Sequence, residues 1–336
     1  MLKVGQVGGG IMGQQHMSVY QQYHRTQVMS LATSNPIVGR QISERFGANY
    51  YENHQEMLEK EDIDVVSIAT PDFAHYLIAR DALEAGKHVL VEKPLTMSVE
   101  ESREILSLAN KRNLTVMTLF SNRWISSYAQ AKQLLKKKNL TPIMGYARKN
   151  DRIFVPTEMI KWADLTTPAY FLSSHDIDLM NWLFESKVVE VYASAVKKVL
   201  KGIGIDTPDA IQIQAKYENG AIATFESCWS YPNTYPTIVD SFVEVITEEE
   251  VIYLDRKIEN MEYASPEGFT TPRNQLHFEI TGKRRGAFVY AIEHFVDCIL
   301  DNKPVQITLK SSHHVTAILS AAHISIKSGK PEKVIE

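Results

Sequence analysis

Residues Gly8–Gly13 read GGGIMG and match the pattern GxGxxG. The motif directly follows the apolar run 2–7 and precedes a stretch with helical spacing. In that context Gly8 permits a tight turn, Gly10 lets the backbone approach a diphosphate, and Gly13 permits close packing of helix on strand. Free N–H groups at the start of the helix attract such an anion. A glycine-rich turn can also be purely structural, but this position favours dinucleotide binding by Gly8, Gly10, Ile11, Met12 and Gly13.

No acidic residue stands about 20 positions after the glycine motif, where such domains commonly bind the ribose hydroxyls. The segment 31–36 reads LATSNP. The Thr33 and Ser34 hydroxyls can hydrogen-bond a 2′-phosphate, which a carboxylate would repel. Arg40, in the following helix, adds positive charge if it faces the pocket. The cofactor is therefore NAD or NADP, with a slight preference for NADP.

The first third of the chain alternates apolar runs with helical periodicity. We expect strands at 2–7, 27–32, 63–69, 88–91 and 114–119, and helices at 36–46, 74–85 and 98–111. This alternation predicts βαβ units and a parallel sheet. The run 63–69, IDVVSIA, is typical of a strand buried on both faces. We expect an NAD(P)-binding Rossmann domain over 1–120.

The pattern changes after about residue 120. We expect helices at 127–138 and from near 174, then strands at 188–196, 210–217, 221–228, 238–246 and 251–254. Glu218-Asn219-Gly220 is a hairpin signal because Asn-Gly readily adopts positive φ angles. Helices follow at 287–301 and 312–328. The fold class is α/β: an N-terminal Rossmann parallel sheet plus a C-terminal α+β domain, 121–336, with a large, mainly antiparallel open sheet. The final helices pack within this domain or on the first one.

Length and composition are those of a globular protein of about two domains. The chain has 336 residues, 44% hydrophobic and 23% charged, with a net charge of −4. A net charge this close to neutral does not indicate binding to nucleic acid or to an anionic membrane. No run of the sequence approaches the roughly 20 apolar residues of a membrane span. Cys228 and Cys298 lack metal or disulfide spacing, so we expect free thiols, no metal site and a cytoplasmic location.

Several segments together resemble one family. They are the glycine motif, SIATP at 67–71 with His75, and AGKHVLVEKPL at 85–95. Asn122-Arg123, Trp162 with Asp164, HDID at 175–178 and IKSGKP at 326–331 match later landmarks of the same family. The chain thus resembles the Gfo/Idh/MocA family, that of glucose–fructose oxidoreductase and inositol 2-dehydrogenase, over nearly its whole length.

The resemblance implies hydride transfer between a nicotinamide and a hydroxyl-bearing carbon of a sugar, inositol or related polyol. It also implies a second domain whose open sheet covers the nicotinamide and builds a homo-oligomer, a dimer or tetramer. Lys93 matches the family's lysine, which implies that it contacts the reacting hydroxyl. His175 matches the family's histidine, which implies that it exchanges the hydroxyl proton. These roles are chemically sensible, because alkoxide charge needs a cation and the proton needs a base near neutral pKa.

The same resemblance extends the site to further residues. On the coenzyme side these are Ala69, Thr70, Pro71, His75, Glu92 and Lys93. On the substrate side they are Arg123, Trp162, Asp164, Phe171 and Asp178, the last as an orienting or structural acid.

One departure concerns the residue four positions before His175. Many dehydrogenases of the family carry Asp there, whereas this chain has Phe171. Without that carboxylate the histidine lacks a partner that raises its basicity and fixes its tautomer. Either another acid substitutes, such as Asp164 or Asp176, or the substrate is not a plain polyol, or hydride chemistry is impaired.

Three functions are compatible with these residues. The main one is an NAD(P)-dependent dehydrogenase or reductase acting on CH–OH groups. The alternatives are a nucleotide-binding regulator or inactive homologue, and an NAD-dependent redox-neutral glycosidase.

Overall fold

The computed structural model describes residues 1–257 and 259–336. They form two compact units. The N-terminal unit comprises Met1–Ser121 and His277–His313, and the second unit comprises Asn122–Leu276 and His314–Glu336. The chain therefore returns to the N-terminal unit after leaving it, and the last boundary falls inside helix α10 (Leu309–Ser328).

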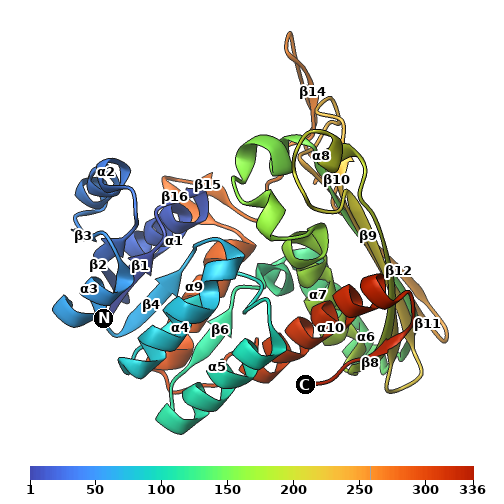
Figure 1. Cartoon of the computed structure of the whole chain (residues 1–336), viewed down its shortest axis with the longest axis horizontal. Helices are drawn as coiled ribbons and strands as arrows, with labels where there is room; N and C mark the ends of the chain where they lie inside the picture. The colour runs from blue at the N-terminus through green and yellow to red at the C-terminus, as the bar shows by residue number, and fades with distance from the viewer. Residues whose placement is uncertain (258) are drawn as a thin grey trace. The chain divides into compact units, whose positions relative to one another are not determined.

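The N-terminal unit is built on a parallel sheet in the order β3-β2-β1-β4-β5-β6 (Figure 1). Its strands are β1 (Leu2–Val7), β2 (Thr26–Ala32), β3 (Asn49–Tyr51), β4 (Val65–Ile68), β5 (His88–Val91) and β6 (Val116–Thr118). The order reverses between β1 and β4, and in such sheets ligands bind at the carboxyl ends of the strands beside this point. The predicted Rossmann-type parallel sheet is confirmed.

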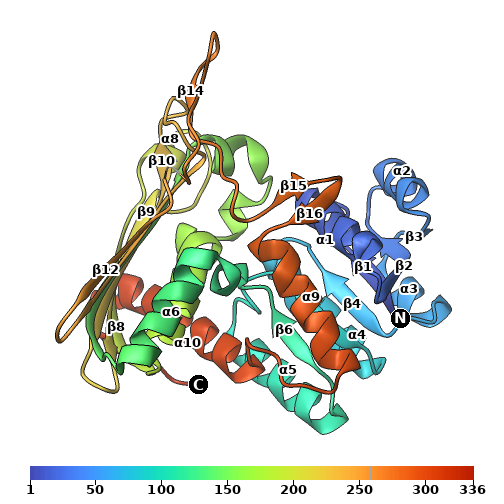
Figure 2. The ribbon, with the colours of Figure 1, turned by 180° about the vertical axis from the view of Figure 1, so that it is seen from behind.

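Helices cover both faces of this sheet. Helices α1 (Ile11–Gln22) and α9 (Ala287–Leu300) lie on one face, and α4 (His75–Glu84) and α5 (Val99–Arg112) on the other (Figures 1 and 2). The expected helix 36–46 is α2 (Pro36–Phe46), N-capped by Asn35. Strand β3 and the short helix α3 (His54–Lys60) were not predicted from the sequence.

The second unit contains a seven-stranded sheet in the order β12-β11-β7-β10-β9-β8-β17. Its strands are β7 (Pro142–Arg152), β8 (Val188–Val196), β9 (Ala210–Tyr217), β10 (Ile222–Tyr231), β11 (Val239–Thr247), β12 (Val251–Asp255) and β17 (Glu332–Lys333). Every pair is antiparallel except β7 with β10. The mainly antiparallel sheet is confirmed, as is the β9–β10 hairpin, where Gly220 has φ +88°.

Strand β7, which was not predicted from the sequence, lies in the middle of this sheet. It carries Lys149 and Asp151 into the interior, where both are buried. A charged strand interior conceals the apolar alternation on which strand prediction depends. The partner that neutralises Lys149 is Asp176, from a distant part of the sequence.

Helices α6 (Ser126–Lys138), α7 (Ser174–Phe184) and α10 pack on one face of this sheet, while its other face carries no helix in the described residues (Figure 1). The π-helical turn Ala169–Ser173 leads directly into α7. Between β12 and α9 the chain forms two hairpins, β13–β14 (Tyr263–Ser265 with Gly268–Thr270) and β15–β16 (Phe278–Ile280 with Lys283–Arg285).

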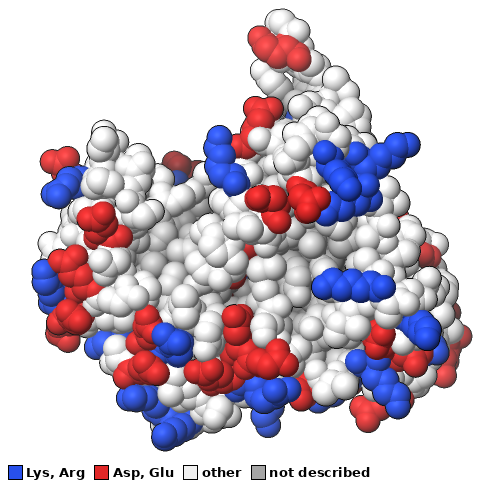
Figure 3. All heavy atoms as spheres, viewed as in Figure 1, with Lys and Arg blue, Asp and Glu red and all other residues white. Residues whose placement is uncertain are grey.

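Acidic and basic side chains are interspersed over the face seen in Figure 3. Across residues 1–257 and 259–336, none of the helices combines the length and the apolar character needed to cross a membrane.

Candidate active site

No side-chain hydrogen bond caps the amino end of helix α1. Gly10 is the N-cap and makes no side-chain hydrogen bond, and no acidic residue lies in the first turn. A Cβ built on Gly10 would meet no protein atom within 4 Å. Ile11 and Met12 follow, 67% and 40% exposed. The first N–H groups and the positive end of the helix dipole are thus open to an anion such as a diphosphate.

The other two glycines of the motif are required by packing. Gly8 has φ +96°, and a Cβ there would lie 2.3 Å from the carbonyl oxygen of Ala69. A Cβ on Gly13 would lie 1.9 Å from the carbonyl oxygen of Gly8. The loop after β1 is therefore pressed against the loop after β4, which contains Ala69, Thr70 and Pro71. The residues fit a dinucleotide at this edge, because these close contacts still leave space beside Gly10.

The end of β2 forms the next part of this edge. The Thr33 N–H donates to the Tyr51 carbonyl at 3.1 Å, and the Tyr50 hydroxyl donates to the Thr33 carbonyl at 3.0 Å. The Arg40 guanidinium lies over the Tyr50 ring, 5.3 Å from its centroid. Arg40 is thereby held close to Thr33, while the neighbouring Ser34 is exposed.

His75 connects two loops of the N-terminal unit. Its Nδ1 lies 2.7 Å from the Pro94 carbonyl oxygen, and its Nε2 lies 3.1 Å from that of Thr70. Burial lowers the pKa of His75, and both ring nitrogens lie within hydrogen-bond distance of a backbone carbonyl. The loop that follows Lys93 is thus fixed against the loop after β4.

Lys93 stands two residues beyond the carboxyl end of β5, half-buried, and its peptide bond to Pro94 is cis. Its backbone N–H donates to Oε2 of Glu92 at 3.2 Å, and Oε1 of Glu92 lies 3.2 Å from Nε2 of His16. His16 was not among the residues predicted from the sequence. It lies in the buried stripe of α1 that starts at Gly13, where a polar residue among packed neighbours was the available signal.

In the second unit the HDID segment forms the start of α7. His175 is half-buried, and its neighbour Asp176 is buried and paired through Oδ1 with the ammonium of Lys149. Asp178 receives a bidentate pair from Arg123, with Nε–Oδ2 at 2.9 Å and Nη2–Oδ1 at 2.6 Å. Arg123 and Asp178 are therefore partners of each other in the interior.

Phe171 lies against an apolar cluster of the second unit that includes Trp229 and Leu172. Its ring meets Trp229 edge to face, with centroids 5.6 Å apart. Trp162 packs on the same cluster, whereas Asp164 is exposed in a short 3-10 turn.

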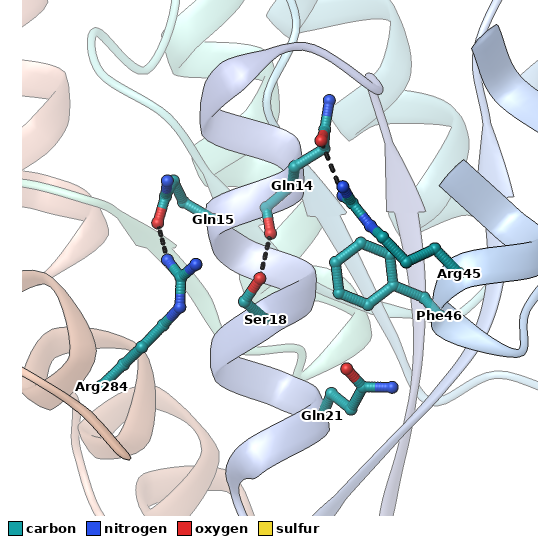
Figure 4. A pocket seen from close by; sticks show the side chains of 7 residues that line it. All are labelled: Gln14, Gln15, Ser18, Gln21, Arg45, Phe46 and Arg284. Atoms are coloured by element: carbon teal, nitrogen blue, oxygen red, sulfur yellow. Dashed lines mark hydrogen bonds between the residues drawn. The ribbon is translucent and has the colours of Figure 1, made fainter. Parts of the chain in front are cut away.

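A polar cavity of about 350 Å³ lies along α1. Arg45 reaches Gln14 from α2, and Arg284 reaches Gln15 from the other side of the helix (Figure 4). Its remaining lining residues are Ser18, Gln21 and Phe46. None of the predicted site residues lines this cavity, so it is separate from the candidate coenzyme site.

Comparison with known proteins adds to this geometry. Residues 2–120 match the family model described as "Oxidoreductase family, NAD-binding Rossmann fold", and residues 128–253 match the GFO/IDH/MocA C-terminal domain. The levoglucosan dehydrogenase of Pseudarthrobacter phenanthrenivorans is 26% identical over 67% of this chain and 67% of its own length. The scyllo-inositol 2-dehydrogenase (NAD(+)) of Bacillus subtilis is 25% identical over 90% of this chain and 87% of its own.

A solved structure, that of GenD2 from gentamicin A biosynthesis in complex with NAD, superposes with a TM-score of 0.87. It is 23% identical, and the match covers 100% of this chain and 97% of that one, which establishes the same fold. The first family model matches within the N-terminal unit and the second within the second unit. The chain belongs to the Gfo/Idh/MocA family and is an oxidoreductase with an NAD-binding Rossmann fold.

Proposed function

We propose that this enzyme transfers hydride between the nicotinamide of NAD(H) or NADP(H) and a hydroxyl-bearing carbon of a sugar, inositol or related polyol. The observation that carries the proposal is the open amino end of α1, where Gly10 leaves room for a diphosphate and no side chain caps the helix. Relatives named for scyllo-inositol and levoglucosan support the substrate class.

We assign to Lys93 the role of stabilising the negative charge that develops on the reacting oxygen. Oxidation of an alcohol removes a hydride, which a bound nicotinamide accepts, and a proton from the hydroxyl. An ammonium beside that oxygen stabilises the alkoxide character of the transition state. Glu92 and His75 support this role, because they hold the peptide on either side of Lys93.

We assign to His175 the exchange of the hydroxyl proton. It is half-buried at the start of α7, and imidazole is the side chain best suited to exchange a proton near neutral pH. Asp176 and Asp178 are engaged with Lys149 and Arg123, so we assign both acids to positioning α7. Asp164 is exposed, so we assign contact with a polyol hydroxyl to this acid. Trp162 and Phe171 then supply apolar surface.

The coenzyme site is assigned to the carboxyl edge of the N-terminal sheet. Arg40 favours NADP there, since its guanidinium is held over Tyr50, beside the backbone of Thr33. A guanidinium is a strong partner for a 2′-phosphate. The assigned residues are Gly8, Gly10, Ile11, Met12, Gly13, Thr33, Ser34, Arg40, Ala69, Thr70, Pro71, Glu92 and Lys93, with His75 as their support.

We further propose that the enzyme self-associates as a dimer or tetramer through the face of the seven-stranded sheet that bears no helix in the described residues. Met144 and Ile222 are register partners on that face, and Tyr253 projects on the same side. All three are exposed. Exposed apolar side chains gathered on a sheet face are typical of association surfaces.

The test is a spectrophotometric assay of the purified full chain with NAD or NADP and a panel of scyllo-inositol, myo-inositol, levoglucosan and glucose. We expect formation of reduced nicotinamide with at least one of them, loss of turnover in Lys93→Ala, and a drop of about 100-fold or more in His175→Ala. Coenzyme binding without turnover on any polyol would favour a regulator. Aglycone release from glycosides without net reduction would favour the glycosidase.

A further inference from the structure

A chain of buried polar groups crosses the core of the N-terminal unit. The Tyr20 hydroxyl lies 3.2 Å from Oγ of Ser67, which lies 2.8 Å from Nδ1 of His16. Nε2 of His16 lies 3.2 Å from Oε1 of Glu92. Tyr20, His16 and Ser67 are 0% exposed, and Glu92 is 9% exposed. Burying a polar group costs free energy unless it has a hydrogen-bond partner, and each of these four groups has one.

The ionised state of Glu92 fixes the hydrogen bond at one end of this series of polar groups. Burial alone would raise the pKa of Glu92, but the hydrogen bond and charge of His16, with the nearby charge of Lys93, hold that pKa below its usual range. An ionised carboxylate only accepts, so Nε2 of His16 donates to it. Nδ1 of His16 lies within hydrogen-bond distance of the Ser67 hydroxyl, whose oxygen accepts from Tyr20.

Ser, His and Glu are also the residue types of a hydrolytic triad, but this arrangement does not form one. The Ser67 hydroxyl has no exposed surface, and its oxygen is already in contact with both Tyr20 and His16. No substrate carbonyl can reach it. Any effect of these buried polar groups on the candidate active site must therefore act through Glu92, at the other end of the series.

Glu92 connects His16 to the backbone of Lys93. One of its carboxylate oxygens faces His16, and the other accepts the backbone N–H of Lys93. Its own N–H donates to the Ile68 carbonyl at 2.9 Å, which ties the backbone to β4. The side-chain orientation of Glu92 is thus set from α1, the helix whose amino end is the candidate diphosphate site.

We propose that His16 is a positioning residue for Lys93: it holds the Glu92 carboxylate in the orientation that fixes the Lys93 peptide. The Phe288 ring closes the site from α9, edge to face with His16 at 5.2 Å between centroids. The catalytic part of this inference rests on the proposed role of Lys93, whereas its structural part does not.

Hydrogen exchange of the Lys93 backbone amide tests the structural part without turnover. In His16→Leu, which removes the donor to Glu92 at similar volume, we expect this amide to exchange about ten-fold faster. The Leu119 amide, which donates to Val91 at 2.8 Å on the neighbouring strand end, should keep its rate. His16→Gln, which retains an N–H donor, should restore most of the protection. Unchanged exchange of Lys93 in His16→Leu would overturn the proposal.

Kinetics with the polyol found active in the panel test the catalytic part. We expect His16→Leu to lower kcat about ten-fold with the coenzyme Kd nearly unchanged. The double variant His16→Leu/Glu92→Gln should be no slower than Glu92→Gln alone, because both act through one carboxylate. The matched control is His54→Gln, since His54 also pairs with a carboxylate, Asp81, at 2.8 Å in the same unit. It should leave kcat unchanged.

Two results separate this inference from the proposed function. If wild type turns over no polyol but Lys93 exchange still rises in His16→Leu, the proposed function fails and the positioning role stands. If the kcat losses of His16→Leu and Glu92→Gln multiply in the double variant, His16 does not act through Glu92, and the inference fails.

Discussion

The ring of Phe171 packs edge to face on Trp229, with their centroids 5.6 Å apart. Phe171 stands four residues before His175, the position for which the family resemblance implies an acid. Phe171 is thus part of the apolar packing around Leu172 and Trp229. Its aromatic ring contributes to the stability of the second unit.

Replacing Phe171 by Asp should therefore damage the fold before it helps the chemistry. A carboxylate in this apolar cluster loses solvation, so we expect the free energy of unfolding to fall by about 2 kcal/mol or more. Phe171→Leu, which keeps the apolar contact, should cost about 1 kcal/mol. Urea denaturation measures both. A Phe171→Asp enzyme as stable as wild type and with higher kcat would refute this role.

Local patterns predicted the N-terminal unit well, for physical reasons. Strands β4 and β5 are buried between helices, and such strands read as continuous apolar runs. Ser98 caps α5 by accepting the N–H of Glu101, a signal contained within four residues. The glycine motif is equally local, because its steric demands arise within one turn and the loop beside it.

The features that could not be predicted from the sequence depend on partners far along the chain. Strand β7 is stable with Lys149 inside only because Asp176 neutralises it. Arg123 and Asp178 meet within the second unit, and Phe171 meets Trp229. No spacing rule connects such pairs, since only the tertiary fold brings them together.

The pairing of Arg123 with Asp178 should be visible in stability. Both side chains are nearly fully buried, at 6% and 1% exposure. Asp178→Leu leaves an unpaired guanidinium inside, so we expect a loss of about 3–5 kcal/mol in the free energy of unfolding. The double variant Arg123→Met/Asp178→Leu should lose less, because no charge is left alone. Equal losses in the single and double variants would argue against a coupled buried pair.

Ionisation of Glu92 should make the free energy of unfolding depend on pH in the acidic range. Its folded-state pKa lies below its ordinary value of about 4.3. The ionised group therefore stabilises the fold above that value, and the contribution is lost as pH falls through the folded-state pKa. The difference in unfolding free energy between wild type and Glu92→Gln should be constant near neutral pH and shrink below about pH 4. A difference that persists unchanged to about pH 3 would contradict this assignment.

Arg40 should set the preference between coenzymes. Its guanidinium is already held over Tyr50, so binding a 2′-phosphate costs little reorganisation. We expect Arg40→Ala to weaken NADP(H) binding about ten-fold and NAD(H) binding less than about two-fold, measured by titration of reduced-nicotinamide fluorescence. The matched control is Arg45→Ala, because Arg45 bonds Gln14 in the same unit but lies at the polar cavity. Equal losses for both coenzymes would remove the reason for favouring NADP.

The most direct test uses the open space at Gly10. A methyl group there meets no protein atom within 4 Å, and the residue has φ −70°, so Gly10→Ala should fold with wild-type stability. Gly202→Ala is the matched control, since a methyl group there is equally unobstructed. Calorimetric titration with NADH and NADPH should show a Kd weaker by about ten-fold or more in Gly10→Ala and no change in Gly202→Ala. Wild-type affinity in a folded Gly10→Ala protein would show that the diphosphate does not bind at the start of α1.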